Sequence, residues 1–386
     1  MNPELSSFAA RLRLLIADSQ SAIRNPQFSE LALELFSLQF KHNSAYQKIC
    51  TAQSLTPATV AHWTQIPAVP TAAFKELELT SLAPEARTAV FHSSGTTAQK
   101  PSRHFHSAES LTVYEASLWA GFAGHFQFPI ANFQSSGSAT RTVEKLAIGN
   151  WQLAILTPPP EKAPHSSLVH MFEIVRQKLG AAETAFVGSL ANDGAWTLNF
   201  TATIAALDHP PQSAIRSPQL LLGTAFSFVH LVDYLAEQNL RLALPPGSRV
   251  METGGYKNRS RVLPKAELHA LITDRLGVPA ENIICEYGMS ELSSQAYDSE
   301  SHPQSSIRHA SIFRFPSWAR VQIISPETGR EVVEGETGLI RIFDLANVFS
   351  VAAIQTEDLG IRRGDGFELI GRAQLAEPRG CSLMTA

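Results

Sequence analysis

Cysteine is scarce in this chain. Only Cys50, Cys285 and Cys381 occur among 386 residues, and long stretches separate them. An odd number of scattered cysteines argues against a disulfide framework and against a zinc cluster. We therefore expect the protein to work in a reducing compartment, the cytoplasm. The apolar neighbours of Cys50 and Cys285 predict that both thiols lie in the core.

Long apolar runs and an excess of charge of one sign are also missing. No window approaches the roughly 18 consecutive apolar residues that span a bilayer. Met1–Gln20 carries charges inside an amphipathic pattern, which argues against a secretory signal. The net charge of -4 gives no general attraction to nucleic acid or to an anionic membrane. We expect no nucleic acid partner, no integral membrane segment and no secretion.

The chain does have enough apolar sequence for a large core, with 44% hydrophobic and 17% charged residues. Leucines and alanines at three- and four-residue intervals predict helices near the N-terminus. Alternating strand-like and helical stretches then predict an α/β fold with a mainly parallel sheet flanked by helices, and short β-rich runs follow. We expect a helical N-terminal part of the large domain at residues 1–90 and an α/β core at residues 91–312. A small β-rich subdomain would follow at residues 313–372, and a flexible arm at residues 373–386.

A stretch rich in hydroxyl groups, Ser93–Arg103, is here called the hydroxyl loop. It follows an expected strand, Thr88–Phe91, and precedes an expected helix, Ser107–Gly121. Backbone N–H groups and two cations in such a place can surround a phosphate. The second glycine and the Lys-Ser/Thr pair of a nucleoside-triphosphate P-loop are absent, which excludes that motif. A polar surface turn is the alternative interpretation.

Two glycine-bearing turns follow expected strands of the α/β part. Gly254 and Gly255 come after Arg249–Met251, and Tyr287–Glu291 comes after Asn282–Cys285. Ligands of open α/β sheets collect at the carboxyl ends of the strands, so both turns are candidate binding positions.

Two histidines, His165 and His170, flank an expected helix start at Ser166 and Ser167. They are candidates for contacts with a ligand or an acyl pocket at that helix start. Single histidines are more often structural, which is the alternative for each.

The order of these motifs resembles the adenylate-forming superfamily of acyl-CoA synthetases, peptide-synthetase adenylation domains and luciferases. The resemblance extends from about Phe91 to Arg372, although each motif alone is weak. The motifs in order are the hydroxyl loop, Gly254-Gly255, Tyr287–Glu291, Gln355–Gly360 and Gly371-Arg372. Within the superfamily, the chain is similar to the acyl-protein synthetases of the LuxE type at Ser93–Thr97, at His165–His170 and above all at Arg379–Leu383.

The resemblance implies that ATP and Mg²⁺ are used to activate a carboxylate as an acyl adenylate, which requires alignment and charge stabilisation. Ser290 would donate to the α-phosphate, and Glu291 would hold Mg²⁺. Tyr287 would stack on adenine, and Asp358 would accept from the ribose hydroxyls. The expected ATP-binding residues are Ser93, Ser94, Gly95, Thr96, Thr97, Gly254, Gly255, Tyr287, Gly288, Asp358 and Arg372.

Two departures from the superfamily pattern stand out. Its loop reads Gly-x-Pro-Lys where this chain has Ala98–Arg103, so either Lys100 or Arg103 would supply the cation. The chain also ends where the mobile C-terminal domain would begin. A tail carrying Cys381 stands there instead. Cys381 is nine positions beyond Arg372 in the chain, and a stretch of that length can extend about 30 Å.

The first functional hypothesis is an ATP-dependent acyl-protein synthetase. It would activate a fatty acid, transfer the acyl group to Cys381 as a thioester and deliver it to a partner acyl reductase. Catalytic residues would be Cys381, Glu291 and Ser290. The alternatives are a ligase that acylates CoA or a carrier protein, and a non-catalytic subunit that binds nucleotide or acyl chains.

Overall fold

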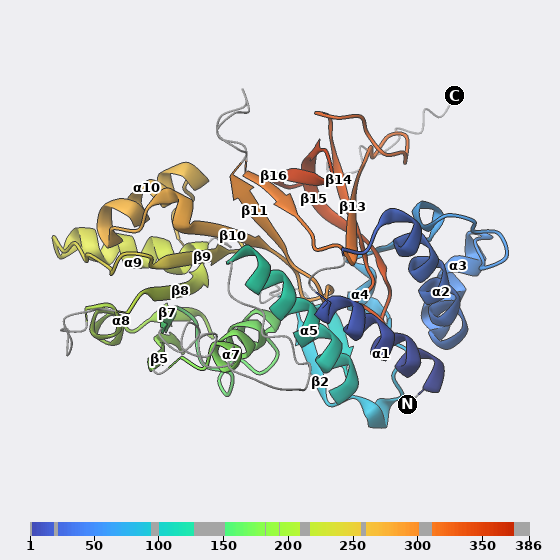
Figure 1. Ribbon diagram of the computed structural model, residues 1–386, viewed down its shortest axis with the longest axis horizontal. Coiled ribbons are helices and arrows are strands. Elements are labelled where there is room, and N and C mark those ends of the chain that lie inside the picture. The colour runs from blue at the N-terminus through green and yellow to red at the C-terminus, as the bar shows by residue number, and fades with distance from the viewer. Residues whose placement is uncertain are drawn as a thin grey trace, which may run out of the picture.

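A computed structural model describes most of the chain. The described residues are 2–18, 22–93, 100–126, 151–181, 183–192, 194–208, 217–255, 260–300 and 311–373. Figure 1 shows a long, twisted sheet with helices on both sides.

Within these ranges, twelve strands form one sheet in the order β13-β14-β15-β16-β12-β11-β10-β9-β8-β4-β5, with β1 beside β15. In this order, the strands from β10 to β5 pair parallel with one another. The strands from β13 to β10 pair antiparallel with one another, and β1 lies parallel to β15. The bounds are β1 Val69–Pro70, β4 Gln152–Ile155, β5 Glu183–Phe186, β8 Gln219–Thr224, β9 Arg249–Thr253, β10 Ile283–Tyr287, β11 Ala296–Glu300, β12 Ser311–Arg314, β13 Ala319–Ile324, β14 Thr337–Asp344, β15 Ala353–Arg363 and β16 Gly366–Arg372.

Helices pack on the sheet and form the N-terminal part of the chain. The α-helices among the described residues are α1 Pro3–Ala17, α2 Asn25–His42, α3 Ser44–Ala52, α4 Ala73–Glu76, α5 Ala108–His125, α7 Ser167–Leu179, α8 Phe200–Leu207, α9 Ala225–Glu237 and α10 Lys265–Leu276. Short 3₁₀ turns lie at Trp63–Gln65, Pro84–Ala86 and Ala280–Asn282. None of the helices in the described part is both long and apolar enough to cross a membrane.

The parallel strands are buried on both faces, as successive side chains point to opposite sides. Leu221 and Val250 face a core shared with α9 and α10. Leu222 and Met251 face the other core, shared with α5 and α7. The two helix layers lie on opposite sides of β8 and β9 in Figure 1. The chain therefore has the expected α/β class, with helices around a large sheet.

The N-terminal helices cover the antiparallel strands. In α1, Leu5, Phe8, Leu12 and Ile16 are buried at helical spacing. They belong to one apolar core with residues of α2, α3 and strands β13 to β15. The sheet is continuous from β10 through β11, so the β-rich part shares the sheet of the α/β part.

The expected order of strand, hydroxyl loop and helix is wrong in one respect. The loop connects two antiparallel strands, β2 Ala89–His92 and β3 Arg103–His106, before Ser107 caps α5. His104 and His106 are the buried alternate residues of β3. Because the buried residues of β3 are histidines, the strand lacks the apolar alternation by which strands are predicted from sequence. The loop therefore does not open directly into a helix N-terminus. A second hairpin pairs β6 Gly188–Leu190 with β7 Trp196–Leu198.

Candidate active site

The first part of the site is the turn after β9. Gly254 has a φ of 70°, a left-handed conformation that glycine adopts without steric cost. Gly254 and Gly255 are exposed, and a Cβ added at either would meet no heavy atom within 4 Å among the described residues. The turn therefore presents bare backbone, which leaves room for a flat ligand to approach.

The second part joins β10 to the β15–β16 pair. The Tyr287 hydroxyl donates to Asp358 Oδ2 at 2.8 Å. Asp358 and Arg372 are register partners on β15 and β16, and Arg372 Nε lies 3.9 Å from Asp358 Oδ1. Burial raises the pKa of Asp358 above its ordinary value. Three residues from three expected motifs are thus in contact, and β15 runs through Asp358.

Aromatic side chains hold the Tyr287 ring. The rings of Phe367 and Phe313 meet it edge to face, with centroids 5.2 and 6.1 Å away. Burial raises the pKa of the Tyr287 hydroxyl well above its ordinary value, so the hydroxyl remains a donor at neutral pH. Next to it, Gly288 allows a close approach, because a Cβ there would lie 2.3 Å from Glu286 Oε1.

The third part is the buried pair Ser290 and Glu291. The Ser290 hydroxyl donates to Glu291 Oε2 at 3.0 Å, and it lies 3.4 Å from Ser102 Oγ. His104 Nδ1 donates to the Ser290 carbonyl at 2.9 Å. Burial lowers the pKa of His104 to about 4, so the ring is neutral at neutral pH and carries its proton on Nδ1. The hairpin that carries the hydroxyl loop is therefore bonded directly to the Ser290–Glu291 turn.

The two ends of the hydroxyl loop are closed by hydrogen bonds. Ser93 Oγ accepts from the Ser102 backbone N–H at 2.9 Å, and the Ser93 N–H donates to the Ser102 carbonyl at 3.3 Å. Lys100 and Arg103 face carboxylates, with Lys100 Nζ 3.2 Å from Glu76 and Arg103 Nη1 3.5 Å from Glu78. Ser94, Gly95, Thr96, Thr97 and Cys381 lie outside the described residues.

The two candidate histidines pack under the same hairpin. His165 Nδ1 donates to the Val90 carbonyl at 3.1 Å, and its ring stacks on His92 with centroids 4.6 Å apart. His170 Nε2 lies 3.2 Å from Glu115 Oε1 of α5. The structure thus gives both histidines supporting contacts to elements of the site, which is compatible with the structural alternative.

Glu286, which is buried in β10 beside Tyr287, belongs to none of the motifs predicted from the sequence. Thr253 Oγ1 donates to Glu286 Oε2 from the neighbouring strand. Burial raises the pKa of Glu286 to about 7, and the charge of Glu252 acts in the same direction. A glutamate inside an otherwise apolar parallel strand is the signal that could have found it, because such strands are buried on both faces.

Two further polar groups lie in the core that faces α5. Among the described residues, His106 Nε2 and the Tyr297 hydroxyl are buried without a hydrogen-bond partner. Buried polar atoms are usually paired, so these two atoms are exceptions to that rule. Burial also lowers the pKa of His106 well below its ordinary value.

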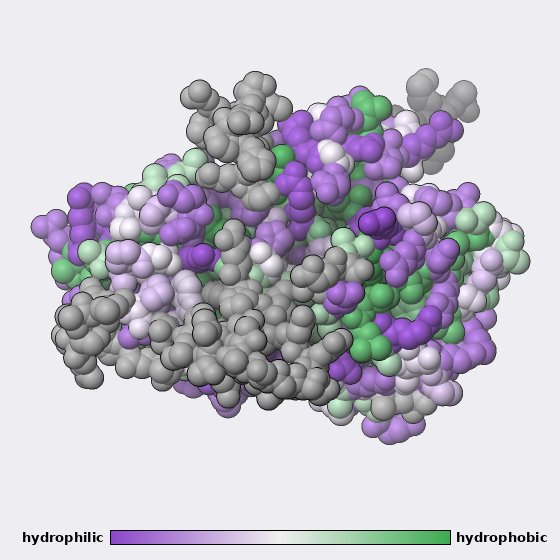
Figure 2. All heavy atoms as spheres, viewed as in Figure 1, coloured by the Kyte–Doolittle hydropathy of each residue, from purple (hydrophilic) through white to green (hydrophobic). Residues whose placement is uncertain are grey.

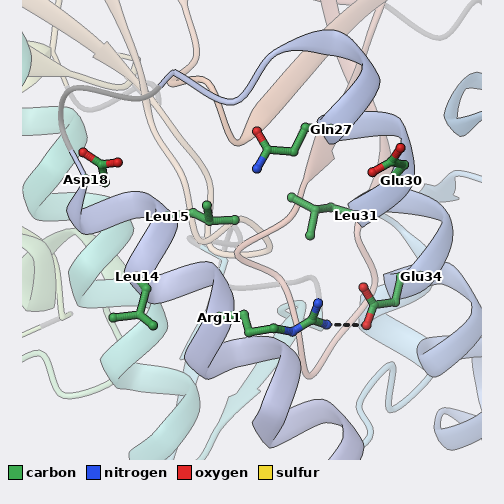
Figure 3. A pocket seen from close by; sticks show the side chains of 8 residues that line it. All are labelled: Arg11, Leu14, Leu15, Asp18, Gln27, Glu30, Leu31 and Glu34. Carbon is green, nitrogen blue, oxygen red and sulfur yellow. Dashed lines mark hydrogen bonds and ion pairs between the residues drawn. The ribbon is translucent and has the colours of Figure 1, made fainter.

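A surface hollow between α1 and α2 shares no residue with this site. Leu14, Leu15 and Leu31 line it together with charged side chains, and Arg11 forms an ion pair with Glu34 across it (Figure 3). Apolar surface gathers over these helices on the face drawn in Figure 2. Leu14 of α1 is 73% exposed.

The chain has the fold of solved CoA ligases. Solved structures of 2-hydroxyisobutyryl-CoA ligase share its fold, with TM-scores of 0.62 in the postadenylation state and 0.61 in an open conformation. Each is 12% identical, and the matches cover 91% and 92% of this chain and 68% and 77% of the ligase chains.

Residues 136–386 match the family described as acyl-protein synthetase, LuxE. The chain belongs to this family and is a ligase. A relative in Aliivibrio fischeri, named long-chain-fatty-acid–luciferin-component ligase, is 23% identical over 383 residues, which cover 96% of this chain and 89% of the relative. A relative of the same name in Vibrio harveyi is 22% identical over 195 residues, which cover 48% of this chain and 49% of the relative.

Proposed function

We propose that this protein is an ATP-dependent acyl-protein synthetase that activates a long-chain fatty acid and transfers the acyl group to its own Cys381. The observation that carries the proposal is the contact between Tyr287, Asp358 and Arg372 beside the buried Ser290–Glu291 turn. These residues come from separate motifs of an adenylate-forming enzyme. The family and the names of the relatives support the fatty acid as substrate.

Adenylation forms a bond between a carboxylate oxygen and the α-phosphorus of ATP, and it breaks the bond to the leaving pyrophosphate. Asp358 would accept from the ribose hydroxyls, with Tyr287 keeping its carboxylate oriented. The bare backbone of Gly254 and Gly255 would border the adenine. The Ser290 hydroxyl would turn from Glu291 to donate to the α-phosphate, where negative charge develops.

The donor set at Glu291 fits a magnesium ion. Mg²⁺ in such sites is held by one or two carboxylates together with the phosphate oxygens of the substrate. Glu291 is a buried carboxylate beside the closed ends of the hydroxyl loop, and Ser290 bonds to only one of its oxygens. When bound, Mg²⁺ would neutralise charge on the phosphates. The side chains of Ser93, Ser94, Thr96 and Thr97 and the backbone of Gly95 would hold the β- and γ-phosphates beside it.

Transfer to the protein thiol is the second half of the proposal. The Cys381 sulfur would attack the acyl carbonyl carbon, the bond from that carbon to the AMP oxygen would break, and the thiol proton would leave to solvent. AMP departs and a thioester remains. The partner would be an acyl reductase that supplies a hydride and a proton, which release the aldehyde and regenerate the thiol. We place this chemistry in the cytoplasm. We also propose that the parts of the chain meet at residues 90, 312 and 372, as the sequence predicts.

The test uses radiolabelled fatty acid, ATP and Mg²⁺ with the full chain. Cys381→Ala is compared with Cys50→Ala, a matched control whose thiol is fully buried in the N-terminal core. We expect the wild type and Cys50→Ala to carry hydroxylamine-sensitive label on the protein. Cys381→Ala should lose that label and keep ATP–pyrophosphate exchange, because adenylation precedes the transfer.

Three outcomes would contradict the proposal at different steps. Undiminished label on Cys381→Ala would refute the thiol transfer. Formation of acyl-CoA at a rate independent of Cys381 would favour the CoA ligase alternative. The absence of ATP–pyrophosphate exchange with a broad panel of acids would favour the non-catalytic subunit.

A further inference from the structure

Three side chains of different chemistry meet behind the nucleotide turns, on the face of the sheet that α10 covers. Glu252 of β9 and Cys285 of β10 are register partners on adjacent parallel strands. His269 reaches them from α10. Cys285 Sγ lies 2.6 Å from Glu252 Oε1 and 3.6 Å from His269 Nε2, and that nitrogen lies 3.7 Å from Glu252 Oε1.

The arrangement differs from a nucleophilic triad. In such a triad the carboxylate bonds to one imidazole nitrogen while the nucleophile faces the other. Here the thiol and the carboxylate face the same nitrogen, Nε2 of His269. Cys285 is also only 4% exposed, so a substrate could not reach the thiol. One sulfur, one nitrogen and one oxygen instead surround a common point, with all three atoms within 4.8 Å of one another.

We propose that Glu252, His269 and Cys285 form a Zn²⁺ site, with a water molecule as the fourth ligand of the tetrahedral ion. Thiolate, imidazole and carboxylate are the ligands of protein-bound zinc, and a thiolate disfavours Mg²⁺ and Ca²⁺. Zn²⁺ would replace the thiol proton, which is released. One thiolate, one carboxylate and a neutral imidazole balance the charge of the ion, so the buried site carries no net charge.

Binding requires one local adjustment. Ligand atoms at about 2.3 and 2.0 Å from a tetrahedral zinc lie roughly 3.5 Å apart. The separations from His269 Nε2 to the sulfur and to the carboxylate are already near that value. Only the 2.6 Å contact between Cys285 and Glu252 has to open, by roughly 1 Å, when the S–H hydrogen bond is replaced by two bonds to the metal.

A second set of contacts supports the ligands. Asp298 Oδ1 accepts from the Cys285 backbone N–H at 2.6 Å, and Asp298 forms an ion pair with Lys265. Lys265 Nζ also donates to Ser311 Oγ at 2.7 Å. The nearby ammonium is thus neutralised by its own carboxylate, and Asp298 anchors the strand that presents the sulfur, as outer-shell partners of metal sites do.

The site was hidden in the sequence because its ligands have no short spacing. The scattered cysteines argued against a zinc cluster, whereas this site uses one cysteine with ligands from two other elements. A metal here would tie α10 to β9 and β10, two residues before Gly254 and Tyr287. The inference does not depend on the proposed function.

The test is metal binding by the purified, tag-free full chain after removal of metal by a chelator. We expect one Zn²⁺ per chain in competition with a chromogenic chelator, and a thiolate-to-metal charge-transfer band with Co²⁺. Cys285→Ser should abolish the band. His269→Gln should weaken binding by more than the roughly 10- to 100-fold that the loss of an outer-shell partner costs. Cys50→Ala and Cys381→Ala, which keep the site, should retain the band.

Absence of stoichiometric Zn²⁺ binding by the wild type overturns the proposal, whatever the variants do. Loss of the band in Cys381→Ala with retention in Cys285→Ser assigns the metal to the tail and also overturns it. Zn²⁺ should raise the Tm of the wild type and leave that of His269→Gln nearly unchanged. An equal rise in both would contradict the site.

Discussion

Replacing Glu286 by glutamine changes one buried carboxyl group and should change how stability depends on pH. Burial raises the pKa of Glu286 from 4.5 to about 7 in the folded chain. At pH values between these two pKa values, Glu286 is ionised in the unfolded chain and protonated in the folded chain. The stabilising effect of the protonated carboxyl is therefore full below pH 4.5 and is lost as the pH rises to 7.

The magnitude follows from the size of the shift. At about 1.4 kcal/mol per pKa unit, a rise from 4.5 to about 7 corresponds to roughly 3 kcal/mol in the free energy of unfolding. Glutamine resembles the protonated carboxyl and does not titrate. The wild type should therefore lose roughly 3 kcal/mol relative to Glu286→Gln as the pH rises through this window.

The assay is urea unfolding of both proteins at several pH values from 4 to 8. Other titrating groups are common to the two proteins, so they cancel in the difference between the curves. Glu327→Gln, on an exposed turn, is the control for the loss of a carboxyl group as such, and its curve should run parallel to that of the wild type. Parallel curves for Glu286→Gln and the wild type would refute the reasoning.

Three further predictions concern the contacts of the site. Tyr287→Phe removes the hydroxyl that donates to Asp358 at 2.8 Å. A hydrogen bond to a charged group contributes about 1.5–3 kcal/mol, and water can reach this partly exposed carboxylate. We therefore expect the free energy of unfolding, measured in urea, to fall by an amount near the lower end of that range. The KM for ATP in pyrophosphate exchange should rise. Gly288→Ala should cost about 1–3 kcal/mol, because its Cβ would lie 2.3 Å from Glu286 Oε1, and an unchanged urea midpoint would contradict this. Burial lowers the pKa of His104 from 6.5 to about 4, so stability is full above pH 6.5 and falls as the pH drops to 4. His104→Asn should flatten this acid limb, which acid titration of the circular dichroism signal would measure.

The regular elements were predictable where their pattern was apolar. The expected helix Ser107–Gly121 overlaps α5, and the expected strand Asn282–Cys285 overlaps β10. The expected strand Arg249–Met251 is two residues shorter than β9, because Glu252 and Thr253 are polar yet buried. Propensity and periodicity describe apolar burial, so they fail where a buried polar group is paired by tertiary contacts.

The candidate site was also predictable in part. The sequence identified the residue types of the candidate site and the order of its motifs, since motifs such as Tyr287–Glu291 are contiguous. It could not assign partners. Tyr287 and Asp358 are 71 residues apart in the chain, and Ser102 and Ser290 are 188 apart. Their contacts depend on strand register and on how the β2–β3 hairpin packs against the turn after β10.

By itself, the sequence determined the α/β class, the order of the nucleotide motifs and the resemblance to acyl-protein synthetases, because these are properties of local pattern. Only the tertiary structure decided that Glu286 is buried with a raised pKa, and that Glu252, His269 and Cys285 share one point. Burial and convergence depend on side chains from separate elements, which are neighbours only once the sheet has formed and α10 has packed on it.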